Sequence, residues 1–70
     1  MTRERAQEMS AAELERWLDA RGVYRTAAAG GTGVWQVLFV RRDKGPITGA
    51  SRVDMLGAVV DAMSQLESGS

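Results

Sequence analysis

The stretch Val34-Trp35-Gln36-Val37-Leu38-Phe39-Val40 is the longest apolar run of this 70-residue sequence. It is rich in β-branched and aromatic side chains, which predicts a β-strand at the centre of a sheet. A strand with one face in water would alternate apolar with polar residues, because successive side chains point to opposite faces. Gln36 is the only polar residue of the stretch, so both faces of the predicted strand are apolar.

The two faces of this predicted strand differ in character, because Trp35, Val37 and Phe39 share one of them. One face must pack against the protein's own helices. A chain of this length has few residues left that could cover the other face. With the aromatic face beneath the helices, the exposed face is aliphatic, which is typical of a protein interface. We therefore predict a protein interface formed by Val34, Gln36, Leu38 and Val40.

Length and composition predict a single domain, residues 1–70, that gains stability from a partner. A domain this short buries only about 60% of the surface that its unfolded chain exposes. Cys and His are both absent, which excludes disulfides and nearly all transition-metal sites, and no cofactor is indicated. Self-association or a permanent partner is the remaining means of stabilisation, so we expect a homodimer that also binds a host protein.

The sequence also bears on the compartment. No apolar stretch approaches the roughly 20 residues of a membrane span, and residues 1–7 are too charged for a signal peptide. We therefore expect a cytoplasmic protein with no membrane partner.

The first helix is predicted from its capping signals. Ser10 and Glu13 have the spacing of a capping box, and Met9 and Leu14 that of a hydrophobic staple. Gly22 suits the left-handed position that closes a helix. These signals predict a helix over residues 11–21, with residues 1–8 either extending it or frayed.

Three strands are predicted to follow. The first covers residues 23–28, with Tyr24, Thr26 and Ala28 on one face and Val23, Arg25 and Ala27 on the other. A glycine-rich loop at residues 29–33 leads to the central strand, and a turn at residues 43–45 leads out of it. Because Pro46 cannot donate a main-chain hydrogen bond, the third strand, residues 47–50, should be short and lie at an edge.

The last helix is predicted to open at a second capping box, from Ser51 to Asp54. Its apolar stripe consists of Leu56, Val59, Val60, Met63 and Leu66, with Asp54, Asp61 and Gln65 away from it. Gly57 inside this helix predicts a close approach by another backbone, and residues 67–70 should fray. The predicted fold is α+β, in the order α-β-β-β-α, with two helices on one face of a three-stranded antiparallel sheet.

The sequence contains no residue pattern that indicates a catalytic site. Without His or Cys, nucleophilic catalysis would need a Ser–Lys pair, and the single Lys44 lies in a predicted turn beside Asp43. The glycines at 30, 31 and 33 open a strand instead of a helix, so they do not form a phosphate loop. We expect a protein that is not an enzyme and has no catalytic residues.

Basic residues leave nucleic-acid binding open as an alternative. Residues 23–52 carry four Arg and one Lys against a single Asp. Aromatic side chains with arginines on an open sheet can stack single-stranded bases. The contacts in that case would be Arg25, Arg41, Arg42, Lys44 and Arg52.

The order of elements resembles the double-stranded-RNA-binding domain. The resemblance rests on Tyr24 after Gly22, the glycine loop, the strand at residues 37–40 and the Gly49-Ala50-Ser51 entry to the last helix. It implies the α-β-β-β-α fold; residues 52–54 replace the family's basic cluster, so a dimerisation module fits better than an RNA binder. The chain also resembles small accessory proteins of phages and mobile elements, which inhibit a host protein by occluding its surface.

Overall fold

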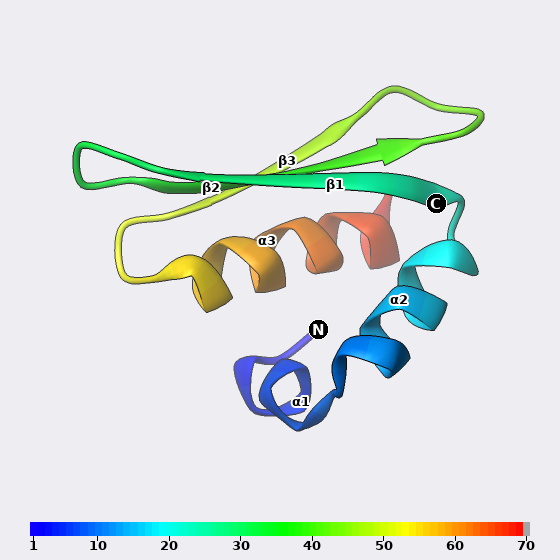
Figure 1. Ribbon diagram of the computed structural model, residues 1–70, viewed down its shortest axis with the longest axis horizontal. Helices are drawn as coiled ribbons and strands as arrows, with labels where there is room; N and C mark the ends of the chain where they lie inside the picture. Colours follow the sequence, from blue (N-terminus) through cyan, green and yellow to red (C-terminus); the bar gives the residue numbers. More distant parts are fainter. Residues whose placement is uncertain (70) are drawn as a thin grey trace.

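A computed structural model describes residues 1–69 and has three helices and three strands within them (Figure 1). The elements are α1 (Arg3–Glu8), α2 (Ala11–Asp19), β1 (Val23–Gly30), β2 (Trp35–Arg41), β3 (Ile47–Ser51) and α3 (Met55–Ser68). The strands form one antiparallel sheet in the order β1-β2-β3. The helices lie on one side of this sheet (Figure 1), which confirms the predicted α+β class and α-β-β-β-α order.

Helix α2 begins where its capping box predicts. The Glu13 amide donates to Ser10 Oγ at 3.2 Å, and the Ser10 amide donates to Glu13 Oε1 at 3.5 Å. The helix ends at Asp19, slightly before the predicted Arg21, and Gly22 turns the chain into β1 with φ of +83°. That positive φ is the conformation in which glycine costs least.

The first residues form a separate short helix, α1, which is docked on α3. Thr2 caps α1, and its hydroxyl accepts from the Arg5 amide. Arg3 forms an ion pair with Asp54 at the start of α3, and the amino group of Met1 pairs with Glu67 near its end. The predicted frayed tail, residues 67–70, includes Ser68, the last residue of α3, whereas Ser70 lies outside the described residues.

A β-bulge at Tyr24 corrects the predicted faces of β1. Val23 pairs with Arg41 but Arg25 pairs with Val40, so one extra residue lies between them. The bulge shifts the alternation, and Val23 therefore points into the core, where it is 5% exposed. The predicted grouping of Val23 with Arg25 and Ala27 is wrong for this reason.

The start of α3 also differs from the prediction. Asp54, not Ser51, caps the helix: its carboxylate accepts from the Gly57 amide at 2.8 Å. Ser51 is the last residue of β3, and its hydroxyl accepts from the Val53 amide at 3.1 Å. A Cβ on Gly57 would lie 2.5 Å from Ser51 Oγ, so the close neighbour of Gly57 is a side chain and not the predicted backbone.

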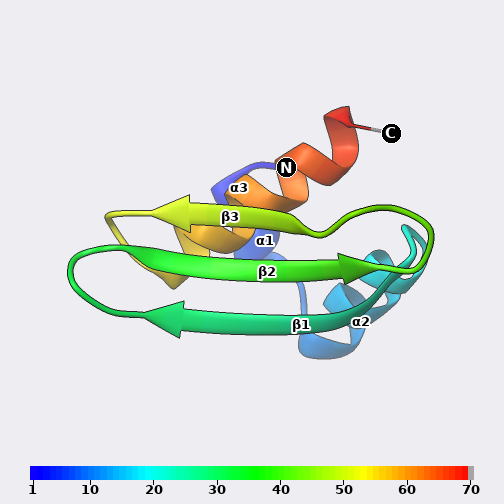
Figure 2. The same cartoon turned by 90° about the horizontal axis from the view of Figure 1, so that it is seen from above.

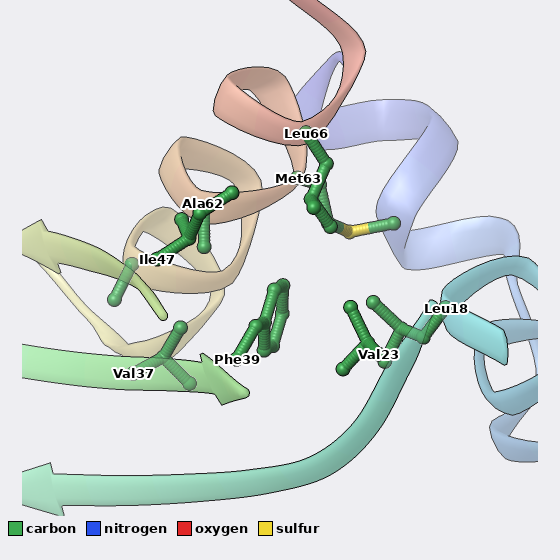
Figure 3. Close-up of a cluster of buried hydrophobic side chains, with 9 residues drawn as sticks. Leu18, Val23, Val37, Phe39, Ile47, Ala62, Met63 and Leu66 are labelled. Atoms are coloured by element: carbon green, nitrogen blue, oxygen red, sulfur yellow. The ribbon is translucent and has the colours of Figure 1, made fainter. Parts of the chain in front are cut away.

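The core lies between α3 and the sheet. Figure 3 shows Val37 and Phe39 pointing from β2 toward α3; Phe39 is 2% exposed. Helix α3 approaches β3 most closely at Gly49, where an added Cβ would collide with the carbonyl of Ala58 and lie 2.7 Å from the amide of Ala62. The buried core residues are Leu18, Val23, Val37, Phe39, Ile47, Ala58, Ala62, Met63 and Leu66.

Candidate interaction surface

The face of the sheet opposite the helices is the outer face. Because Val37 and Phe39 are buried beneath α3, the alternation of β2 turns Leu38 and Val40 to the other side. Ala27 of β1 and Thr48 of β3 are the direct neighbours of Leu38. A shallow hollow of about 300 Å³ lies on this face, and no helix covers it (Figure 1).

Three of the predicted interface residues, Gln36, Leu38 and Val40, fall on β2 at outer-face positions. Val34 precedes the strand and lies half-buried in the connection from β1. The small side chains of Ala27 and Ala29 extend the apolar surface onto β1, and Ala50 extends it onto β3. The outer face is defined below by Ala27, Ala29, Gln36, Leu38, Val40 and Ala50.

The aromatic residues do not form a platform for bases. Phe39 is buried under α3, whereas Trp35 at the other end of β2 is 40% exposed. The Trp35 ring lies over Gly30, its neighbour on β1: a Cβ on Gly30 would lie 2.7 Å from the ring carbon Cζ3. Trp35 and Phe39 are therefore not exposed together on an open face of the sheet, as base stacking would require.

The β3 edge of the sheet is closed by side chains of α3. The Ala50 amide donates to Asp61 Oδ2 at 3.0 Å, and Gln65 Nε2 donates to the Thr48 carbonyl at 2.9 Å. In Figure 2, α3 lies toward the β3 side of the sheet and projects past that strand. One outward amide and one outward carbonyl of this edge therefore have partners within the chain.

The β1 edge is open. Main-chain groups alternate in direction along an antiparallel strand. The main-chain groups of Thr48 and Ala50 point away from β2. The main-chain groups of Leu38 and Gln36, their partners on β2, therefore point toward β1. The main-chain groups of Ala27 and Ala29, which pair with Leu38 and Gln36, therefore point toward β2.

The outward-pointing groups of β1 are consequently those of Thr26, Ala28 and Gly30. Within residues 1–69, no hydrogen bond from a side chain, turn or loop reaches them. The edge also carries few of the devices that block strand addition, because residues 26–30 contain neither proline nor charge. The main-chain groups of this edge are therefore available to pair with another strand.

A groove separates β1 from α2. Helix α2 buries Leu18, and Leu14 and Trp17 pack against the same core. The helix leaves Thr26 and Ala28 of β1 exposed. The groove has a volume of about 680 Å³. Its lining is mainly apolar; Glu15 and Asp19 of α2 add acidic groups, and Arg25 and Arg42 add basic ones.

The predicted basic contacts do not form one surface. Arg41, Arg42 and Lys44 gather around the β2–β3 turn and line a hollow of about 300 Å³, and Arg25 is paired with Val40 near the same end. Arg52 follows β3 at the opposite end of the sheet, beyond the Ser51–Trp35 pair.

Intramolecular partners occupy two of these cations. Arg42 forms an ion pair with Asp19 at 3.0 Å. Arg41 Nε donates to the Gly45 carbonyl at 2.9 Å. The basic end of the sheet therefore offers fewer free cations than the sequence suggests.

The Arg3–Asp54 pair has shifted acid–base properties. The hydrogen bond from Arg3 lowers the pKa of Asp54 below its ordinary value of 3.8, and the Gly57 amide lowers it further. The pair lies at the junction of α1 and α3, away from the outer face. Its role is structural, since it fastens the N-terminal helix.

Sequence reasoning missed the residues that close the β3 edge. It placed Asp61 and Gln65 away from the apolar stripe of α3, but gave them no partner. Their spacing of four residues puts both side chains on one flank of the helix. That spacing, beside a short edge strand, was the available signal.

No protein-family model matches the chain, and no curated protein or solved structure is significantly similar to it. Its helix and strand order is compatible with the fold of the double-stranded-RNA-binding domain. None of the helices within residues 1–69 has the length and hydrophobicity needed to cross a membrane. The same residues contain no cluster of three carboxylates that could hold a metal ion.

Proposed function

We propose that the chain is a non-enzymatic protein-interaction module whose outer face binds a partner protein in the cytoplasm. The observation that carries this proposal is the uncovered outer face. Leu38 and Val40 lie on this face of β2, whereas Val37 and Phe39 are buried on the other face of the same strand. Apart from Gln36 and the neighbouring Arg25, which is paired with Val40, this face is aliphatic. Aliphatic surface gains free energy when it leaves water. The partner it fits is a folded protein with an apolar surface of its own.

The mode of action that suits such a module is occlusion. The core among residues 1–69 contains no buried polar or charged side chain, so it offers no preorganised group for a reaction. A small domain that covers part of another protein acts as an inhibitor or accessory factor. The α-β-β-β-α order, which is compatible with the double-stranded-RNA-binding domain, supports this proposal, since some domains of that family serve as dimerisation modules.

A photo-crosslinking amino acid at position 38 tests the outer face. In lysate of the source cells, we expect a discrete protein adduct at this position and none at Ala12, an exposed residue of α2 on the helix side. Unlabelled wild-type protein should compete for the adduct, whereas Leu38→Asp should not. Equal adducts at the two positions, or equal competition by the two proteins, would overturn the proposal.

Leu38→Asp should leave the domain folded, because the side chain lies on the uncovered face. We expect an unchanged circular dichroism spectrum and a shift in Tm of a few degrees at most. Global unfolding would show that Leu38 belongs to the core.

Nucleic-acid binding remains the second proposal, supported by the cations around the β2–β3 turn. It requires affinity that falls steeply with salt, because phosphate contacts release counterions. Fluorescence anisotropy with duplex and single-stranded RNA and DNA at about 50 mM salt tests it. Absence of binding there would remove this second proposal and leave the first intact.

A further inference from the structure

The open β1 edge points to a specific occupant. We propose that two copies of the chain join through β1, antiparallel about a two-fold axis centred on Ala27, to form one continuous six-stranded sheet. This inference extends the proposed function, because it would double the outer face. It uses the edge of β1, however, and so can fail or succeed independently of what the outer face binds.

The main chain of β1 supports this pairing. Its outward groups belong to Thr26, Ala28 and Gly30. With the axis at Ala27, Thr26 stands opposite Ala28 of the second copy, and both residues present their amides and carbonyls to each other. Gly30 then stands opposite Tyr24 of the second copy, so every outward residue of the strand is used.

The exposed aromatic residues support the same register. Tyr24 is 59% exposed at one end of β1, and Trp35 is 40% exposed beside Gly30 at the other. A single chain cannot bring them together, because they lie at opposite ends of the sheet. The two-fold pairing places Tyr24 of each copy beside Gly30 and Trp35 of the other, where aromatic rings contact favourably.

Charge and size are compatible with self-association. The formal net charge of the chain is zero, so two copies do not repel each other as charged bodies. In the proposed register Arg25 stands opposite Ala29 of the second copy and not opposite its own equivalent. At the axis Ala27 faces its own equivalent and Thr26 faces Ala28, and these small side chains leave room for close approach.

The closed β3 edge explains why assembly would stop at two copies. Asp61 and Gln65 bond the Ala50 amide and the Thr48 carbonyl and lie beside the edge of β3, so the six-stranded sheet would have an obstructed strand at both ends. A symmetric pairing of identical edges closes on itself. The assembly is therefore a dimer and not a fibre.

Cysteine trapping tests the register directly, because the natural chain has no cysteine. Residues at the axis form a non-hydrogen-bonded pair with Cα atoms about 4.5 Å apart, a separation that a disulfide can bridge. We expect Ala27→Cys to form a disulfide-linked dimer under mild oxidation. Ala29→Cys should not, since its equivalents lie roughly 13 Å apart along the paired strands.

Proline substitutions test the edge itself by light scattering across a dilution series. Ala28→Pro removes an outward amide and should raise the dimer dissociation constant about 30-fold, because two symmetry-related hydrogen bonds are lost. Thr48→Pro makes the same change at the blocked β3 edge and should leave the dimer unchanged. Leu38→Asp should also leave dimerisation and Ala27→Cys trapping unchanged, which separates this inference from the proposed function.

Two results would overturn the inference. One is a wild-type chain that keeps the mass of a monomer at concentrations of about 100 µM, a level at which weak specific dimers form. The other is a dimer in which Ala27→Cys fails to crosslink or crosslinks no better than Ala29→Cys. Because the cysteine variants remove no main-chain donor, they remain informative if a proline variant fails to fold.

Discussion

The two edges of the sheet differ although both strands belong to the same small domain. At β3, the Ala50 amide and the Thr48 carbonyl are bonded to Asp61 and Gln65 of α3. At β1, the outward groups of residues 26–30 meet no helix. A helix placed under one side of a sheet can thus protect one edge with its own side chains and leave the other as an interaction site.

The cause of the difference is the position of α3. Gly49 lets this helix approach β3 so closely that any larger residue would collide with the backbone at Ala58 and Ala62. The helix is thereby drawn to the β3 side (Figure 2). Helix α2 does not compensate, because it leaves Thr26 and Ala28 of β1 exposed.

Gly49→Ala should have the largest effect on this arrangement. The added methyl group would push α3 away from β3, at a cost of about 3 kcal/mol in the free energy of unfolding, or a fall in Tm of more than about 10 °C. Thermal unfolding followed by circular dichroism measures it. Gly31→Ala, where an added Cβ meets nothing within 4 Å, is the matched control; equal shifts for the two variants would contradict the close approach.

Asp61→Ala should open the β3 edge. The carboxylate accepts from the Ala50 amide at 3.0 Å and from Gln65 Nε2 at 3.5 Å. Loss of the bond to the Ala50 amide is expected to cost about 0.5–1 kcal/mol and to speed hydrogen exchange of that amide about two- to fivefold. Asp61→Asn keeps an acceptor oxygen and should behave nearly as the wild type. If the Ala50 amide exchanges at the same rate in all three proteins, Asp61 does not close this edge.

Arg3→Ala should have the smallest effect, because the ion pair with Asp54 is exposed. The pKa of Asp54 is lowered in the folded protein, so its contribution to stability is present above its ordinary pKa and disappears as the pH falls through the folded pKa.

A comparison with Arg5→Ala isolates this pair. Arg5 lies on the same helix, α1, and no salt bridge involves it within residues 1–69. We expect Arg3→Ala to lower Tm slightly at neutral pH and to converge with the wild type in acid, where Asp54 is protonated in both. A difference that persisted below the folded pKa of Asp54 would show that Arg3 acts through something other than this carboxylate.

Local signals were sufficient for most of the fold. The capping box at Ser10, the glycine at position 22 and the apolar run of β2 each act within a few residues, and the elements they predict are present. The alternation of one strand also groups Val37 with Phe39 on one face, although it does not decide which face lies under the helices. These features depend on short-range geometry, which the sequence states directly.

The interaction surface was less accessible to sequence reasoning. The bulge at Tyr24 reverses the face of Val23, and nothing in the alternation of β1 indicates an extra residue. Ser51 and Asp54 are both residue types suited to capping a helix, and only the extent of β3 decides which of them caps α3. The open β1 edge depends on where two helices lie relative to the sheet, which is a property of the packed molecule.

Hydrogen exchange of the β1 amides at several protein concentrations tests the central claim most directly. We expect the amides of Thr26, Ala28 and Gly30 to exchange quickly in dilute solution and to become protected as the concentration rises. The Ala50 amide should be equally protected throughout, because its partner Asp61 belongs to the same chain. Rapid exchange of the three β1 amides at every concentration would contradict the claim that a second copy fills this edge.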